Sequence, residues 1–200
     1  MNSMEAPTTL TGRPLRADAQ RNRDRIVEAA RAVFAERGLD AQMEEIARRA
    51  EVGVGTLYRH SPTKEALMGE LLADRWRTLS DQARESLAEE SDPWEAFAGT
   101  LRRNAETMSA DAAVRDTIMG SDSPAVWEHS EQARADLLEA TAELIVRGQA
   151  GGVLREDLTV EDVPMMMCGV CATMGAGGPA PGRLDWRRHL ELVLDGTRRR

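Results

Sequence analysis

The stretch from Gly55 to His60 carries side chains that can form hydrogen bonds with the phosphates and base edges of nucleic acid. It holds the hydroxyl, guanidinium and imidazole groups of Thr56, Tyr58, Arg59 and His60. Such groups serve both as contacts to the phosphate backbone and as readers of base edges. Because Gly55 has no side chain, the backbone beside these residues can come close to another molecule. The stretch therefore predicts a contact with nucleic acid.

Two short helices are predicted around this stretch by the spacing of apolar side chains. Apolar residues recur one turn apart in each helix, at Met43, Ile46 and Ala47 and then at Val54, Leu57 and Tyr58. Gly53 and Gly55 interrupt the pattern and indicate a tight turn between the helices. Two short helices joined by a turn that contains glycine form a helix-turn-helix.

A longer string surrounds these helices. It reads IVEAARAVFAERGLDAQMEEIARRAEVGVGTLYRH from Ile26, and KEAL follows after a short break to end at Leu67. The string resembles the TetR family of bacterial transcriptional regulators. The resemblance implies an all-α fold of about nine helices, in which an N-terminal three-helix head with the helix-turn-helix sits on a helical body for ligand binding and dimerisation. It also implies that double-stranded DNA is contacted by Gln42, Gly55, Thr56, Tyr58, Arg59, His60, Lys64 and Arg25.

Two positions depart from the pattern of the family. Glu51 stands where relatives usually have a glycine with a left-handed backbone, which costs a residue with a Cβ atom about 1–2 kcal/mol. Ser61 stands where relatives usually have an aromatic residue beneath the recognition helix, although it also suits the cap of the next helix. An impaired head would leave a helical small-molecule-binding protein, which is the alternative to a regulator.

The charge of the chain is divided unevenly along its length. The formal net charge is −8, yet residues 1–64 hold 11 Lys and Arg against 9 Asp and Glu, and the remaining residues hold 15 against 25. This division is expected when only the N-terminal part meets phosphate. No apolar stretch reaches the length of a membrane-spanning helix or of a signal-peptide core. We therefore expect a soluble, cytoplasmic protein without membrane contacts.

Proline, glycine and capping residues divide the chain into three regions. Residues 1–19 are predicted to form a flexible basic arm, either a solvated tail or a segment that follows the DNA backbone or enters the minor groove. Residues 20–66 are predicted as the helix-turn-helix DNA-binding domain, and residues 67–200 as the ligand-binding and dimerisation domain. Outside the helix-turn-helix, helices are expected at about 20–37, 62–89, 93–108, 110–119, 124–149, 160–174 and 186–199.

Cys168 and Cys171 form a CxxC pair, a spacing that occurs in redox and metal sites. Here the pair lies within the apolar helical run MMMCGVCATM, and none of the three histidines is close to it in sequence. We interpret the two cysteines as small buried side chains. No metal-ligand spacing and no nucleophile–base motif is recognisable elsewhere, so the sequence predicts neither an enzyme nor a cofactor.

Two stripes of small or apolar residues near the C-terminus are predicted to face a second subunit. In the family, the last two long helices pair with those of a partner to form a four-helix bundle. The resemblance therefore implies a homodimer interface made by Cys168, Ala172, Gly175, Trp186, Leu190, Val193 and Leu194. The alternative is that both stripes pack inside one monomer.

The middle helices of the body carry Met and aromatic residues where the family keeps a cavity for a small-molecule effector. Met side chains adapt to ligands of varied shape. The candidate ligand-binding residues are Phe97, Met108, Met119, Trp127, Met165 and Met166, with ordinary core packing as the alternative at each position. Acidic residues of the body could favour a cationic ligand. The resemblance as a whole implies a sequence-specific regulator, a repressor released from a palindromic operator by its ligand.

Overall fold

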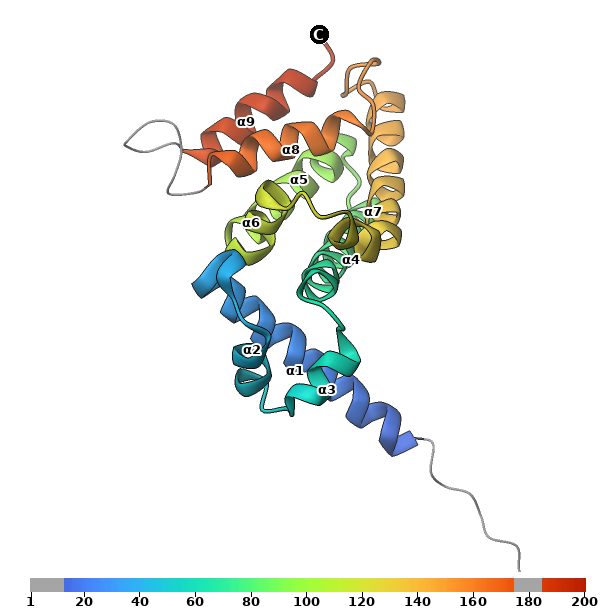
Figure 1. Cartoon of the computed structure of the whole chain (residues 1–200). Coiled ribbons are helices and arrows are strands. Elements are labelled where there is room, and N and C mark those ends of the chain that lie inside the picture. The colour runs from blue at the N-terminus through green and yellow to red at the C-terminus, as the bar shows by residue number, and fades with distance from the viewer. Residues whose placement is uncertain (1–12, 175–184) are drawn as a thin grey trace, which may run out of the picture.

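The computed structural model of the chain describes residues 13–174 and 185–200, and these residues fold into helices joined by short loops (Figure 1). In chain order the elements are α1 (Arg13–Arg37), the 3-10 helix η1 (Gly38–Asp40), α2 (Met43–Arg49), α3 (Val54–His60), α4 (Lys64–Glu89), α5 (Pro93–Ser109), α6 (Ala112–Gly120), α7 (Pro124–Ala150), α8 (Asp162–Ala172) and α9 (Trp186–Thr197). The expected all-α fold is confirmed, and the nine α-helices of the described residues match the expected number. None of the helices in these two ranges combines the length and the apolar character needed to cross a bilayer.

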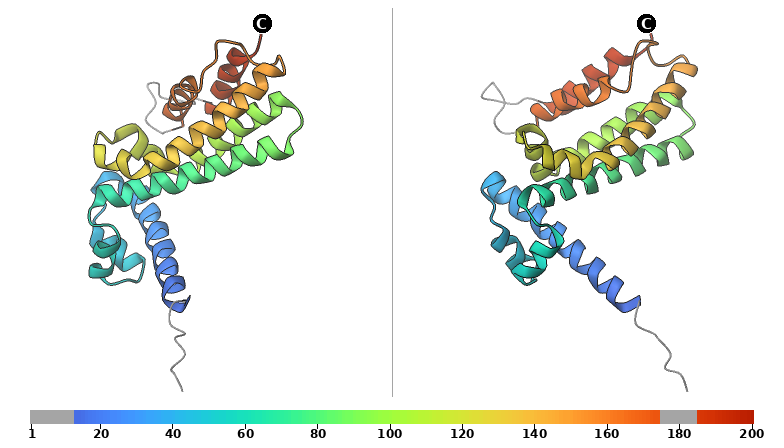
Figure 2. Two further views of the ribbon diagram at one scale, coloured as in Figure 1. Left: turned by 90° about the vertical axis from the view of Figure 1, so that its right-hand side faces the viewer. Right: turned by 45° about the vertical axis from the view of Figure 1, so that its right-hand side comes forward.

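The N-terminal head consists of α1, α2 and α3, and α4 leads from it into the body (Figures 1 and 2). α1 buries one apolar face against the two short helices, because apolar residues recur along it at helical spacing. The core of the head includes Ile26, Ala30, Val33, Phe34, Ile46, Ala47 and Leu57. In Figure 2 the N-terminal part of α1 extends away from the body.

The helix α1 begins earlier than the sequence analysis expects. It starts at Arg13 instead of about residue 20, so residues 13–19, which were expected to belong to a flexible arm, are helical. Pro14 lies in the first turn of the helix, where the N–H that proline lacks would have no intrahelical partner. Residues 1–12 of the expected arm lie outside the described residues.

Thr63, and not Ser61, caps α4. The side chain of Thr63 accepts a hydrogen bond from the backbone N–H of Ala66 at 3.1 Å. Ser61 is fully buried with extended backbone angles, and its hydroxyl donates a hydrogen bond to Glu70 Oε1 at 2.9 Å. At the position where the family usually has an aromatic ring, this chain therefore buries a small polar side chain whose hydroxyl is satisfied by a carboxylate.

The long helices α4 and α7 pack closely against each other in the body (Figure 2). A Cβ atom at Gly69 of α4 would lie 2.5 Å from His129 Cβ and 2.8 Å from Val126 O, both on α7. Only glycine permits this approach, since real Cβ contacts are longer. The body core around α5 and α7 is completed by α8 and α9 through the buried residues Phe97, Leu101, Leu144, Val163, Val170, Leu190 and Leu194.

Glu51, between α2 and α3, has the left-handed backbone that the comparison with the family predicts. Its φ angle is 53°, a region that residues with a Cβ atom seldom adopt. Arg25 Nη2 on α1 donates to Glu51 Oε2 at 2.7 Å, and both side chains are exposed. An exposed ion pair of this kind contributes little to stability, so it offsets only part of the backbone cost.

The buried carboxylate of Asp111 joins the head to the body. Its side chain is only 3% exposed and forms ion pairs with Arg31 of α1 and Arg75 of α4. Asp111 Oδ1 also accepts a hydrogen bond from Val114 N at 3.2 Å and caps α6. Burial, followed by the neighbouring charge of Arg31, lowers the pKa of Arg75. One carboxylate therefore connects α1, α4 and the N-terminus of α6.

We expect Glu51→Gly to raise the free energy of unfolding by about 0.5 kcal/mol, because relief of a backbone cost of about 1–2 kcal/mol exceeds the added freedom of the unfolded chain. Urea denaturation followed by circular dichroism measures the change. Gly38 provides the control, since its φ is also positive, at 56°, and a Cβ atom there would meet nothing within 4 Å. Gly38→Ala should lose about 1 kcal/mol, and a loss of stability in Glu51→Gly would contradict the argument.

We expect Asp111→Asn to lower the free energy of unfolding by about 3–5 kcal/mol, because it removes the buried carboxylate that Arg31 and Arg75 share and leaves only the partly exposed Asp74 beside them. The matched control is Asp116→Asn on the same helix, where an exposed carboxylate lies 3.7 Å from Arg115 Nε. That variant should stay within about 0.5 kcal/mol of the unchanged protein. Equal losses in the two variants, measured by chemical denaturation, would show that the Asp111 cluster has no special role.

Candidate nucleic-acid interface and ligand cavity

The exposed side of α3 presents most of the side chains that the sequence predicts for DNA contact. Gly53 precedes the helix with extended backbone, and a Cβ atom at Gly55 would meet nothing within 4 Å. Tyr58 is 41% exposed, and its hydroxyl lies 3.5 Å from Glu44 Oε1. Arg59 Nε donates to Gly55 O at 3.1 Å, so its guanidinium lies back along α3. The exposed side of α3 therefore carries hydrogen-bonding side chains around Gly55, where the helix backbone is accessible to another molecule.

Gln42 and Lys64 lie at the N-terminal ends of α2 and α4. Gln42 is the exposed residue before α2, and its Nε2 donates to Asp40 O at 2.9 Å. Lys64 is the first residue of α4 and is partly exposed. Helix N-termini carry a partial positive charge and N–H groups without intrahelical partners, which suits the binding of phosphate. Arg25, the remaining candidate, is held in the ion pair with Glu51.

His60 lies differently from its neighbours on α3. Its side chain is only 24% exposed, and its Nε2 is 3.1 Å from Glu70 Oε2 on α4. Glu70 thus faces both His60 and Ser61, and it holds the end of α3 against α4. The structure therefore directs the imidazole of His60 toward the protein, whereas the sequence analysis assigns it to DNA.

A cavity of about 380 Å³ lies in the body between α4, α5, α6, α7 and α8. Its wall is almost entirely apolar. The lining residues are Trp76, Leu79, Leu101, Asn104, Met108, Ile118, Trp127, Arg134, Leu137, Leu138, Thr141, Val163, Pro164, Met167, Cys168 and Cys171. A concave, mostly apolar site with a few polar groups is the usual form of a small-molecule site, and this volume lies in the lower part of the usual range of roughly 300–1,000 Å³.

Two of the six predicted ligand-binding residues, Met108 and Trp127, line this cavity. The other four lie elsewhere. Phe97 is fully buried in the body core, and Met166 packs against the same core. Met119 is 51% exposed at the end of α6, and Met165 is 68% exposed on α8. Residue type alone marks a side chain as apolar and adaptable, but the position along the helix bundle decides whether it meets the cavity, the core or solvent.

The wall also contains residues that the sequence analysis does not propose for ligand binding. Trp76 belongs to an apolar stripe of α4, so its spacing indicates an inward direction without indicating a cavity. Asn104 and Arg134 have no sequence signal of their own, since each is a single polar residue in a helical segment. Cys168, expected at a subunit interface, is exposed and also lines the cavity.

The two cysteines differ in their surroundings. Cys171 is buried, as expected, and burial raises the pKa of its thiol to about 11. It therefore stays protonated at neutral pH, which does not suit a nucleophile or a metal ligand. Cys168 is exposed, contrary to the expectation of two buried side chains. In the described part of the chain, no group of three His, Cys, Asp or Glu side chains is arranged to hold a metal ion.

Of the two C-terminal stripes, the one on α9 packs largely within the protomer, whereas Cys168 and Ala172 of the one on α8 are exposed. Leu190 and Leu194 of α9 are buried in the body core, and Trp186 and Val193 pack against it while partly exposed. The same chain already covers Leu190 and Leu194, so these two side chains offer little surface to a second subunit, and the interface itself stays a prediction. Ala172 is exposed, and Gly175 lies outside the described residues.

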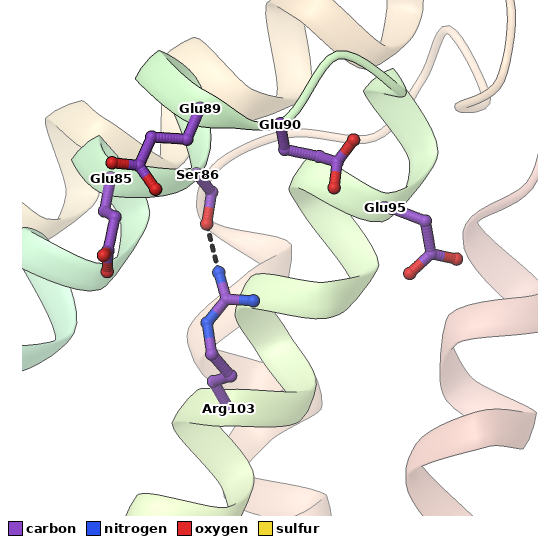
Figure 3. A pocket seen from close by; sticks show the side chains of 6 residues that line it. All are labelled: Glu85, Ser86, Glu89, Glu90, Glu95 and Arg103. Atoms are coloured by element: carbon purple, nitrogen blue, oxygen red, sulfur yellow. Dashed lines mark hydrogen bonds between the residues drawn. The ribbon is translucent and has the colours of Figure 1, made fainter.

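A second hollow, of about 410 Å³, lies at the junction of α4 and α5 (Figure 3). It is lined by Glu85, Ser86, Glu89, Glu90, Glu95 and Arg103, and Arg103 Nη2 donates a hydrogen bond to Ser86 Oγ. The acidic side chains lie at the surface, where water solvates them. These carboxylates are separate from the apolar cavity, so they give it no affinity for a cation.

Comparisons with known proteins agree with this architecture. Residues 26–71 match the family model of bacterial regulatory proteins of the tetR family, and residues 92–199 match the model of the SbtR-like transcriptional regulator C-terminal domain. The crystal structure of the TetR transcription regulatory protein from Mycobacterium vanbaalenii is 36% identical, with a TM-score of 0.65, and the match covers 92% of this chain and 99% of that chain.

Two curated relatives match over shorter segments. The A-factor receptor protein of Streptomyces griseus is 34% identical over 130 residues, which are 64% of this chain and 44% of that protein. The HTH-type transcriptional repressor KstR of Rhodococcus jostii (strain RHA1) is 36% identical over 85 residues, which are 42% of this chain and 40% of that protein. The chain thus spans less than half the length of these two relatives.

The family is established by the extent of these matches, since the C-terminal model alone covers more than half of the chain and the M. vanbaalenii structure matches over nearly its whole length. The chain belongs to the TetR family of bacterial regulatory proteins, which are transcriptional regulators and not enzymes.

Proposed function

We propose that the protein is a homodimeric, sequence-specific DNA-binding repressor that a small-molecule ligand releases from a palindromic operator. The observation that carries this proposal is the exposed side of α3, with Tyr58 and Arg59 on it and with Lys64 at the start of α4. The α3 helices of two subunits would enter successive major grooves about one helical turn or more apart. This role places the protein in the bacterial cytoplasm. The name of the relative KstR supports repression over activation.

The proposal is tested by selecting the fragments of genomic DNA from the source organism that the purified protein retains. The expected result is a set of fragments that share one inverted repeat, because a two-fold dimer reads two equivalent half-sites. Gel shifts with the enriched repeat and with a scrambled repeat then give the specificity ratio. A protein that retains no sequence above background would instead fit the alternative of a ligand-binding protein with an impaired head.

The path from ligand to DNA runs through the Asp111 cluster. Trp76 of α4 and Ile118 of α6 line the cavity, and these two helices also carry Arg75 and the capping residue Asp111. The same carboxylate holds Arg31 of the head. A ligand that separates α4 from α6 would therefore shift the head. Release requires only that the ligand bind the shifted conformer more tightly, and a ratio of about 100 corresponds to about 2.7 kcal/mol.

We expect Lys64→Ala to weaken binding to all DNA sequences by a similar factor, because a lysine at a helix N-terminus contacts phosphate and not bases. The plot of the logarithm of affinity against the logarithm of salt concentration should lose about 0.9 of its slope for each bound subunit. The control is Arg84→Ala, which removes one positive charge from α4 far from the head. An unchanged slope in Lys64→Ala would remove this residue from the interface.

The subunit contact is assigned to the uncharged outer face of α8 together with the neighbouring part of α9. On α8 this face consists of Met165, Cys168, Gly169 and Ala172, which recur three or four residues apart and are all exposed. Leu192 of α9 is 53% exposed. Small residues let two helices approach closely, and an exposed apolar face of this extent in a soluble protein indicates association.

We expect Met165→Glu to convert the dimer to a folded monomer, because a charge on this face would lose its hydration in the contact. Light scattering gives the mass and circular dichroism gives the helix content. Met119→Glu is the matched control, since Met119 is also exposed but lies at the end of α6. It should remain dimeric. Leu190→Glu does not test the interface, because the burial of Leu190 within the protomer makes unfolding the expected outcome. A dimeric Met165→Glu protein would place the contact elsewhere.

A further inference from the structure

Arg134 of α7 is the charged residue among the described residues that line the apolar cavity. It is both exposed and part of the lining, so it borders the cavity where the wall meets solvent. Within the described part of the chain we find no ion pair or hydrogen bond to this guanidinium. Other arginines of the body are paired, for example Arg102 with Glu191 and Arg187 with Glu106. Arg134 therefore offers an unused set of N–H donors beside an apolar wall.

A second unused donor lies in the wall itself. Trp76 Nε1 is buried and has no hydrogen-bond partner among the described residues, and the nine-tenths-buried Asn104 likewise has none there for its Oδ1. Indole N–H can only donate, whereas the amide of asparagine can turn to present either its oxygen or its NH2 group. No carboxylate is present among the described lining residues. The polar groups of the wall thus favour a ligand rich in acceptor oxygens and disfavour a cation.

We propose that the cavity binds an amphiphilic carboxylate, with the apolar body between Trp76, Met108 and Trp127 and the anionic group at Arg134. This inference rests on the proposed function, in which the cavity receives the effector, and it names the chemical class of that effector. A methylene group has about the volume of a water molecule in the liquid, ~30 Å³. A cavity of about 380 Å³ therefore accommodates a chain of about ten carbon atoms.

The assignment reverses the sequence-based idea of a cationic ligand. That idea depended on the many acidic residues of the body, but a cluster of them borders a separate hollow at the surface (Figure 3). The charge that a ligand meets is set by the side chains within a few ångströms of its path, since water and salt screen the more distant ones. At the apolar cavity, that nearby charge is the guanidinium of Arg134.

The test compares three probes with the same ten-carbon chain and different head groups: decanoate, 1-decanol and decylammonium. Binding is measured at pH 7 without DNA by isothermal titration calorimetry, below the concentrations at which the probes form micelles. Decanoate is expected to bind at least about tenfold more tightly than decylammonium, with decanol between them, because hydrogen bonds to a charged group are the stronger ones.

The variant Arg134→Gln tests whether Arg134 is the residue that binds the anionic head group. In this variant decanoate and decanol should bind within about twofold of each other, while the affinity for decanol stays near that of the unchanged protein. The matched control is Arg84→Gln, which removes the same charge from an exposed arginine of α4 that does not line the cavity. It should keep the preference for decanoate.

Three results would overturn the proposal: decylammonium binding as tightly as decanoate, a preference for decanoate that survives in Arg134→Gln, or no binding of any probe. DNA binding is measured separately, by gel shift of the ligand-free protein. If the ligand-free protein binds no DNA, the proposed repressor function is contradicted, and the comparison of the three head groups remains valid. Normal DNA binding together with any of the three results would contradict the ligand class and leave the repressor standing.

Discussion

The carboxylate of Asp111 fixes how the head sits on the body. Removing a carboxylate from water is unfavourable by several kcal/mol, and only close, well-directed partners offset the loss. Here the guanidinium groups of Arg31 and Arg75 and the N-terminus of α6 all point at the same group. The head cannot turn relative to α4 and α6 without separating these charges. A buried ionic cluster of this kind favours a few discrete orientations of the head on the body over a continuous range of orientations.

The helix α4 links this cluster to both candidate sites. It begins at Lys64, which is beside the proposed DNA surface, and it reaches the cavity wall at Trp76, about 18 Å along the axis at 1.5 Å per residue. Arg75 immediately precedes Trp76, so a change in the cavity acts directly beside the ionic cluster. The close crossing of α4 over α7 at Gly69 holds the helix against the body between the two sites. One continuous helix therefore connects the cavity wall with the proposed DNA surface.

The two departures from the family pattern are accommodated by polar contacts. Glu51 keeps the left-handed backbone that glycine normally provides, and its side chain holds Arg25 of α1. Ser61 replaces a large aromatic contact with a hydrogen bond to Glu70, which also faces His60. These contacts fix the ends of the helix-turn-helix, and they direct the side chains of Arg25 and His60 toward the protein's own carboxylates. The head therefore depends on hydrogen bonds at places where its relatives usually depend on glycine flexibility and aromatic packing.

Caps, glycines and apolar periodicity act within a few residues, so the helices, their order and the helix-turn-helix are predictable from the sequence. Asp92 and Asp185 cap α5 and α9 with their own side chains, and the left-handed position of Glu51 followed from its place in the motif. What each apolar face contacts depends on the packing of the whole chain. Phe97 and Met108 lie on one side of α5, yet the first enters the core and the second the cavity. Periodicity predicts the side of the helix from which a side chain projects. Which other residues it contacts at its position along the helix depends on how the whole bundle packs. For the same reason the stripe through Leu190 and Leu194 indicated a partner helix, and only the fold showed that their partner belongs to the same chain.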